Sequence, residues 1–231
     1  MSNQGSKDYA GLIARAALSA RAIKLNPTDP FTWDSGYRMP IYNDNRMLLF
    51  SPKNRRLVTE AFLSVIDCQR IRCDVAAGVA TGGIPFASWI AEALGKPLVY
   101  VRDTAKAHGL GKQIEGIDTH ADIAEKHVVV VEDLVSTGGS SVRAVQALRD
   151  AGARAEHCLC VFSYGLSQAR DTFAKLRPPC DVRPLLTYPI LIETIREAGS
   201  TDSAQLRMLE DWVLDPFSWG ERHGFPRKER N

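Results

Sequence analysis

Residues 128–141 read VVVVEDLVSTGGSS: an apolar run, two acids, and then a loop of hydroxyls and glycines. Four valines in succession, with no polar residue between them, are typical of a strand that is buried on both faces of a sheet. Glycines allow a ligand to approach the backbone closely, and the helix expected from about Ser141 would present unpaired N–H groups to it. The stretch therefore predicts a strand, an anion-binding loop and a helix, in that order.

The two acids of this stretch, Glu132 and Asp133, require a different part of the ligand from the part that the loop binds. Carboxylates repel an anion, whereas they accept hydrogen bonds from vicinal sugar hydroxyls. A single ligand that carries both a phosphate and a ribose diol satisfies both halves of the pattern. The alternative is an ordinary strand-to-helix turn with a solvated acidic pair. The combination of acids, hydroxyls and glycines over residues 132–141 disfavours it.

Strand and helix patterns alternate on both sides of this stretch. The expected strands cover residues 74–80, 98–102, 128–132, 157–163 and 183–186. Helices are expected over residues 51–68, from the loop at 81–85 to about residue 94, and over residues 141–150 and 167–176. The alternation predicts an α/β fold whose central parallel sheet has five strands, with the last strand at an edge.

The ends of the chain are predicted to be less regular. An amphipathic helix is expected over residues 10–23, residues 31–50 are expected to be irregular or hairpin-like, and a further helix is expected over residues 202–214. The tail from residue 216 is expected to be loop-like, with Trp219 and Phe225 as anchors. The apolar positions expected to be buried are Leu12, Ala16, Ala20 and Ile23 in the first helix, and Leu57, Phe62 and Val65 in the helix over 51–68.

Two further loops leave the carboxyl ends of expected strands, where ligands bind in open α/β sheets. Residues 81–85 read TGGIP, which is either an ordinary tight turn or a second anion site, for pyrophosphate. Residues 102–112 carry four basic side chains among small residues. They form either a solvated loop or a flexible lid that brings cations onto a leaving polyphosphate.

Composition excludes several classes of protein. The 231 residues carry 29 Lys and Arg against 27 Asp and Glu, so the net charge of +2 argues against a nucleic-acid-binding surface. Hydrophobic residues make up 45%, which excludes a disordered or collagen-like chain. Neither a membrane span nor a signal peptide is expected. Five cysteines, an odd number without a C-x-x-C pair, predict buried free thiols and a reduced, cytoplasmic compartment.

These motifs resemble those of a known family. The stretch at 128–141 resembles the phosphoribosyl-pyrophosphate binding motif of type I phosphoribosyltransferases, and residues 8–220 resemble the orotate phosphoribosyltransferases among them. The segments that carry the second resemblance are SG at 35–36, PIY at 40–42, DNR at 44–46, TGGIP at 81–85, YVR at 100–102, AK at 105–106, HG at 108–109, QIEG at 113–116 and VFSYG at 161–165.

The resemblance implies the transfer of ribose 5-phosphate from phosphoribosyl pyrophosphate to orotate, giving orotidine 5'-monophosphate and pyrophosphate in pyrimidine (UMP) biosynthesis. It implies Mg²⁺ as the cofactor, no metal site built by the protein alone, and a homodimer whose lid reaches into the neighbouring active site. It also implies the type I fold as a single domain over residues 1–231, with a hood mainly at 26–50, a core at about 51–200, and a C-terminal helix and tail at 201–231.

Roles for individual residues follow from the same resemblance. The catalytic residues would be Arg102, Lys106, His108 and Asp133. Those that bind phosphoribosyl pyrophosphate would be Thr81, Gly82, Arg102, Lys106, His108, Glu132, Asp133, Leu134, Val135, Ser136, Thr137, Gly138, Gly139 and Ser140. Orotate would contact Arg38, Tyr42, Ser136 and Tyr164. A non-proline cis peptide is expected between Ala80 and Thr81.

The chain departs from the family pattern at four positions. Asp34 and Asp103 stand where well-known members carry lysine, Met39 where serine is usual, and Gly82 where one branch has lysine. These changes bear on substrate affinity and base preference. Two alternatives therefore remain beside the orotate enzyme: a phosphoribosyltransferase for another base such as a purine, and a regulator that senses phosphoribosyl pyrophosphate with the same fold.

Overall fold

The computed structural model describes residues 8–104, 113–199 and 201–228. Its contacts divide the chain into two compact units. We call Leu49–Thr187 the sheet unit, and Met1–Leu48 together with Tyr188–Asn231 the terminal unit. The C-terminal segment therefore folds with the N-terminal one; one domain with a hood at 26–50 stays a prediction.

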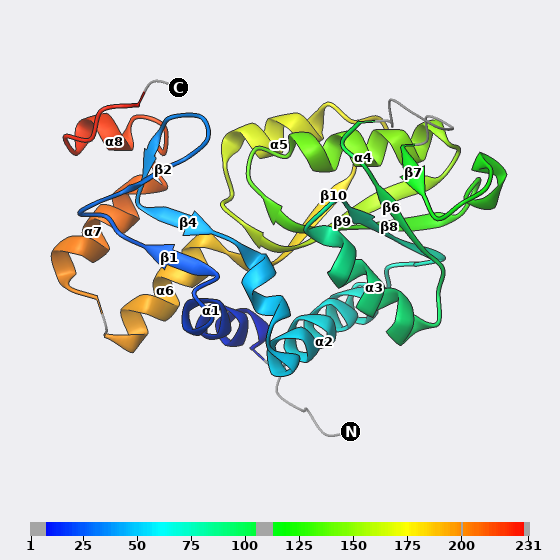
Figure 1. The fold of residues 1–231 in the computed structure, drawn as a ribbon, viewed down its shortest axis with the longest axis horizontal. Helices are drawn as coiled ribbons and strands as arrows, with labels where there is room; N and C mark the ends of the chain where they lie inside the picture. Colours follow the sequence, from blue (N-terminus) through cyan, green and yellow to red (C-terminus); the bar gives the residue numbers. More distant parts are fainter. Residues whose placement is uncertain (1–7, 105–112, 200, 229–231) are drawn as a thin grey trace. The chain divides into compact units, whose positions relative to one another are not determined.

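The sheet unit is built on a six-stranded, mostly parallel sheet, so the predicted fold class is confirmed (Figure 1). The strands, in spatial order, are β10 (Asp181–Thr187), β9 (Arg154–Ser163), β8 (His127–Val135), β5 (Val75–Val79), β6 (Leu98–Val101) and β7 (Ile114–Glu115). The first five are the predicted parallel strands, with β10 at an edge as expected. The sixth, β7, adds antiparallel to β6. A strand of two residues has no recognisable periodicity, which is why the sequence predicted only five.

Helices cover both faces of this sheet. In Figure 1, α4 (Gly139–Asp150) and α5 (Ser167–Ala174) lie on one face, and α2 (Pro52–Cys68) and α3 (Gly83–Leu94) on the other. The four valines of β8 are all at most 2% exposed, as two covering layers require. Val128 and Val130 belong to one core cluster with Ala144 and Val145 of α4. Since side chains alternate along a strand, Val129 and Val131 face the opposite layer.

The terminal unit combines helices with two antiparallel strand pairs. The strands are β1 (Ile23–Leu25), which pairs with β4 (Ile41–Asn43), and β2 (Phe31–Thr32), which pairs with β3 (Arg38–Met39). The helices are α1 (Tyr9–Ser19), α6 (Tyr188–Ala198), α7 (Ser203–Trp212) and α8 (Trp219–Arg222). Two short 3₁₀ segments, Asn45–Leu49 and His120–Asp122, complete the elements of the described residues.

The first helix is shorter than predicted. It ends at Ser19 because Arg21 takes a left-handed φ of 55° and the Ala22 N–H turns back to the Ala17 carbonyl at 2.9 Å. Ile23 consequently belongs to β1 instead of the helix. Its buried face was also predicted wrongly, since Leu12, Ala16 and Ala20 are half-buried. The buried positions are the smaller Gly11 and Ala14 together with Ile13 and Ala17.

The second helix has the predicted bounds but a rotated face. Phe62 is buried as predicted, whereas Leu57 and Val65 are half-buried. The fully buried positions are Val58, Ala61, Phe62 and Ile66. Helix α2 packs on both α3 and β10. Its buried face is therefore wider than the one predicted from Leu57, Phe62 and Val65.

Buried aromatic rings hold the terminal unit together. Tyr188, Trp212 and Trp219 are at most 1% exposed, and the Trp212 indole N–H lies 3.1 Å from the sulfur of Met39. Met39 is itself fully buried, so this departure from the family pattern is a core residue of the unit. The tail was expected to be loop-like, but Trp219–Arg222 form α8. Trp219 anchors the tail as predicted, and its ring stacks on that of Phe225 at 6.0 Å.

Four of the five cysteines are buried thiols, as predicted; Cys68, at the end of α2, is exposed. None of the described helices combines the length and the apolarity that a membrane crossing requires.

Candidate active site

The site is built where three strands of the sheet unit end side by side. Strands β5, β6 and β8 are parallel neighbours, so the loops after Val79, Val101 and Val135 leave from one edge of the sheet. Strand β8 runs farther than predicted, because its pairing with β9 continues to Val135↔Ser163. Asp133 therefore lies within the strand together with Glu132, and alternation sends their side chains in different directions.

The helices that follow β5, β8 and β9 begin without a side-chain cap. No side chain caps the N-terminus of α3, α4 or α5. By contrast, α1, α2 and α7 are capped by Asp8, Ser51 and Asp202. An uncapped first turn leaves backbone N–H groups and the positive end of the helix dipole to bind an anion. The two glycine-rich loops that lead into α3 and α4 are thus suited to phosphate groups, as the sequence predicted.

Gly138 shapes the second of these loops. It takes a left-handed φ of 82°, and a Cβ there would lie 3.0 Å from the Phe173 ring. Only glycine meets both conditions without strain. The turn at Gly138 leads directly into α4, with Ser136 and Thr137 just before it in the chain and Ser140 in the first turn of the helix, as expected for a phosphate cradle.

The first glycine-rich loop lies against Asp133 of β8. A Cβ on Gly82 would lie 2.3 Å from Oδ1 of Asp133, and one on Gly83 would lie 2.2 Å from the Val131 carbonyl oxygen. The peptide between Ala80 and Thr81 is cis, as predicted. The start of α3 therefore lies directly against the end of β8, so that the first loop is part of one site with Asp133 and is more than an isolated turn.

Glu132 is set apart from Asp133 by its burial. It is 6% exposed, and its two carboxyl oxygens accept hydrogen bonds from the Asp133 N–H at 3.0 Å and from the Ser141 hydroxyl at 3.3 Å. Burial, reinforced by the neighbouring charge of Asp133, raises the pKa of Glu132 to about 9. Burial therefore disfavours the charged form of Glu132, whereas the neighbouring Asp133 is only half-buried.

This pKa makes a prediction about stability. The unfolded protein releases the Glu132 proton near pH 4.5 and the folded protein only near pH 9, so folding loses stability as the pH rises between those values. The loss is at most about 1.4 kcal/mol per pH unit. Glu132→Gln keeps the shape of the neutral carboxyl and does not ionise. The melting temperature of the variant minus that of the wild type should therefore increase from pH 5 to pH 9. A difference in melting temperature that stays constant across this pH range would contradict the raised pKa of Glu132.

The base of the predicted lid is fixed at both ends. The Arg102 N–H donates to the Gln113 carbonyl at 2.9 Å, and the Gln113 side-chain amide donates to the Arg102 carbonyl at 3.1 Å. Arg102 thereby stands at the end of β6, beside the other two loops. Lys106 and His108, the other predicted lid cations, lie outside the described residues.

A residue that the sequence analysis missed also reaches this edge. Arg143 of α4 donates to Asp103 through Nε at 2.8 Å and through Nη2. Its Nη2 also lies 3.2 Å from the Ser140 hydroxyl. No local pattern marks Arg143, because its partner Asp103 lies 40 positions earlier in the chain.

The predicted orotate contacts fall into both units. In the sheet unit, Ser136 lies in the phosphate loop, and Tyr164 is 2% exposed with its ring edge against Phe162. In the terminal unit, Tyr42 is 41% exposed on β4, and Arg38 packs 6.0 Å from the Phe225 ring. The Nε of Arg38 is buried and makes no hydrogen bond among the described residues.

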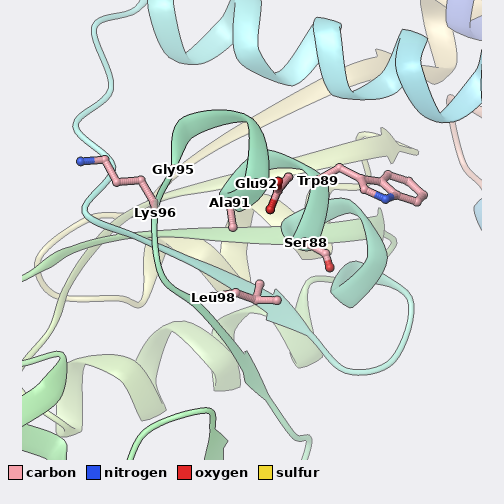
Figure 2. A pocket seen from close by; sticks show the side chains of 7 residues that line it. All are labelled: Ser88, Trp89, Ala91, Glu92, Gly95, Lys96 and Leu98. Carbon is pink, nitrogen blue, oxygen red and sulfur yellow. The ribbon is translucent and has the colours of Figure 1, made fainter.

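A separate cavity of about 550 Å³ lies on the sheet unit away from this edge. Figure 2 shows its lining from the C-terminal half of α3 to the start of β6: Ser88, Trp89, Ala91, Glu92, Gly95, Lys96 and Leu98. None of the predicted site residues is among them.

Comparison with known proteins agrees with the motifs. The phosphoribosyl transferase domain family matches residues 47–180, more than half of the chain. The orotate phosphoribosyltransferase of Lactiplantibacillus plantarum is 40% identical over 213 residues, which are 92% of this chain and 98% of the relative. That of Bacillus caldolyticus is 42% identical over 208 residues, 90% of this chain and 98% of the relative.

Solved structures share the fold. The orotate phosphoribosyltransferase of Aeropyrum pernix superposes with a TM-score of 0.68 and 29% identity, over 80% of this chain and 98% of that one. The UMP synthase of Leishmania donovani gives a TM-score of 0.73 and 25% identity, over 89% of this chain and 42% of that one. From the family match and the identity over nearly the whole chain, we conclude that this chain belongs to the orotate phosphoribosyltransferase family.

Proposed function

We propose that the protein transfers ribose 5-phosphate from phosphoribosyl pyrophosphate to orotate, forming orotidine 5'-monophosphate and pyrophosphate in pyrimidine biosynthesis. Its close relatives bear the name of this activity. The observation that carries the proposal is the contact of Asp133 with Gly82 between two uncapped helix starts. One carboxylate between two anion cradles matches a ribose with a phosphate group on either side.

In the reaction, the bond between the anomeric carbon and pyrophosphate breaks, and a bond to the orotate ring nitrogen forms as that nitrogen loses its proton. The loop at 136–140 binds the 5-phosphate, and Leu134 and Val135 lead the chain into it. Asp133 accepts hydrogen bonds from the ribose hydroxyls and stabilises the positive charge that grows at the anomeric carbon. Glu132 takes part in ribose binding as a neutral carboxyl.

The leaving group is assigned to the other two loops. Thr81 and Gly82 line the pyrophosphate, and Arg102, Lys106 and His108 neutralise its developing charge. The residues proposed to contact orotate are Ser136 and Tyr164 of the sheet unit and Arg38 and Tyr42 of the terminal unit. These roles follow from the resemblance and from the position of each described residue in its own unit.

Mg²⁺ is proposed to arrive with the substrate. The described residues contain no cluster of three or more carboxylate, imidazole or thiol ligands that could hold a metal. Mg²⁺ usually keeps several waters and is bound largely through substrate phosphates, which supports this proposal. When bound, the cation supplies charge neutralisation of pyrophosphate.

We further propose a cytoplasmic homodimer in which the lid of one subunit serves the active site of its partner. Support comes from the family resemblance and, for the compartment, from the four buried thiols. The mass in solution by light scattering should be that of two chains.

The activity is tested by following orotate absorbance after addition of Mg²⁺ and phosphoribosyl pyrophosphate. The purified protein should consume orotate and release pyrophosphate in equal amounts. Uracil and hypoxanthine serve as control bases. If orotate persists while one of these bases is consumed, the base preference assigned here is wrong, and binding without any turnover would favour a sensor.

A further inference from the structure

The pair formed by Arg143 and Asp103 lies at the edge of the phosphate cradle. Arg143 is on α4, four positions after Gly139, and its side chain reaches back over the first turn of the helix. Its Nη1 would lie 3.3 Å from a Cβ on Gly139, and its Nη2 lies 3.2 Å from the Ser140 hydroxyl. The guanidinium therefore stands beside two residues of the loop proposed to bind the 5-phosphate.

The fold does not depend on this pair. The side chains of Arg143 and Asp103 are 52% and 55% exposed. An ion pair with this exposure stabilises a protein by only about 0–1 kcal/mol. Its position, which joins the end of β6 to the first turn of α4, therefore calls for a reason other than stability.

The donors of Arg143 are only partly used. Asp103 accepts from Nε and Nη2, and Ser140 is within reach of Nη2. Nη1 donates to no described residue. Since a guanidinium can bind a carboxylate and a phosphate through different N–H groups, Arg143 can keep Asp103 while it binds an anion.

Asp103 by itself would work against an anion site. A carboxylate at this edge repels the phosphate that the uncapped start of α4 attracts. Paired with Arg143, it instead fixes a long side chain in one orientation, which lowers the entropy that the side chain loses when an anion binds.

We propose that Arg143 binds the 5-phosphate of phosphoribosyl pyrophosphate and that Asp103 positions it. This inference rests on the proposed function, since that function supplies the ligand. Arg143 adds a side-chain cation to a cradle otherwise made of backbone N–H groups and hydroxyls. Asp103 acts only through Arg143 and touches no substrate.

The test measures binding of Mg²⁺-phosphoribosyl pyrophosphate and of ribose 5-phosphate by calorimetry, without orotate. Arg143→Gln should weaken both ligands about 10-fold, the loss expected for one charged hydrogen-bonding partner. The KM for orotate and the melting temperature should stay near the wild-type values. The matched control is Arg154→Gln, because Arg154 and Glu125 form a similarly exposed pair at the start of β9. This control should change neither affinity.

Asp103→Asn separates positioning from charge. In the wild-type background it should weaken phosphoribosyl pyrophosphate binding about 3-fold, since Arg143 loses its anchor. In the Arg143→Gln background it should strengthen binding, since an unpaired acid is removed from the anion site. A purely structural pair would show neither effect.

Each of three results would overturn the proposal. The first is an unchanged affinity of Arg143→Gln for ribose 5-phosphate, and the second is an equal loss of affinity in Arg154→Gln. The third is that Asp103→Asn changes the affinity for phosphoribosyl pyrophosphate in the same direction in both backgrounds. The proposed function is judged separately by wild-type turnover of orotate. If the wild-type protein binds phosphoribosyl pyrophosphate but leaves orotate intact, the proposed function is wrong. The comparison of Arg143→Gln with the wild type still decides whether Arg143 binds the phosphate.

Discussion

Asp133→Asn is expected to lower kcat/KM for orotate phosphoribosylation by about 10²–10³, the usual cost of removing a group that stabilises charge in the transition state. Asp133 is the more exposed member of the acidic pair, and burial raises the pKa of Glu132 to about 9. Asparagine keeps the size of the side chain and loses the charge. The loss should therefore appear mainly in kcat, while binding of phosphoribosyl pyrophosphate and the melting temperature change little.

Glu132→Gln is the matched control for this prediction. The two residues are adjacent on β8, and the same acid-to-amide change is made at each. A glutamine oxygen can accept one of the two hydrogen bonds that Glu132 now accepts, from the Asp133 N–H or from Ser141. Turnover should fall less than about 10-fold, since no charge is removed at neutral pH. Equal losses in the two variants would show that Glu132 is ionised when substrate is bound.

Local sequence was sufficient to predict the elements that form the active-site edge. The valines of β8 and the turn at Gly138 depend on residues next to one another in the chain, whereas the cis peptide at Ala80–Thr81 was expected from the family resemblance. Strand length was less predictable, because β8 continues through Glu132 and Asp133 only where β9 offers hydrogen-bond partners. Nothing in the sequence around Glu132 and Asp133 indicates that pairing.

Contacts between distant residues were beyond sequence reasoning. Met39 is a core residue only because Trp212 lies against it, and the two are 173 positions apart. Arg143 reaches the phosphate cradle only because α4 and the end of β6 are close in the folded chain. Helix α6 was missed because its Tyr188 follows β10 without a loop. The face of α1 was predicted from the helical spacing of Leu12, Ala16 and Ala20, whereas the structure buries the neighbouring positions Gly11, Ile13, Ala14 and Ala17.

The neighbouring glycines Gly82 and Gly83 are expected to respond differently to the same substitution. A Cβ on Gly83 would lie 2.2 Å from the carbonyl oxygen of Val131, which is backbone of a central strand and has no room to move. Gly83→Ala should therefore destabilise the protein by about 1–3 kcal/mol or more, as overpacking does. Thermal melting should show a clear fall in the transition temperature.

Gly82→Ala should instead leave the protein folded and remove most of its activity. The backbone at Gly82 has φ −68° and ψ −30°, which alanine adopts readily, and the three atoms nearest to its new Cβ would all belong to the carboxylate of Asp133. That carboxylate can rotate away, which preserves the fold and displaces the charge from the ribose. Since a displacement of about 1 Å costs about 10²-fold in rate, kcat should fall by that order with an unchanged melting temperature. Full activity in Gly82→Ala would show that Asp133 acts from another orientation, because the present one leaves no space for the methyl group.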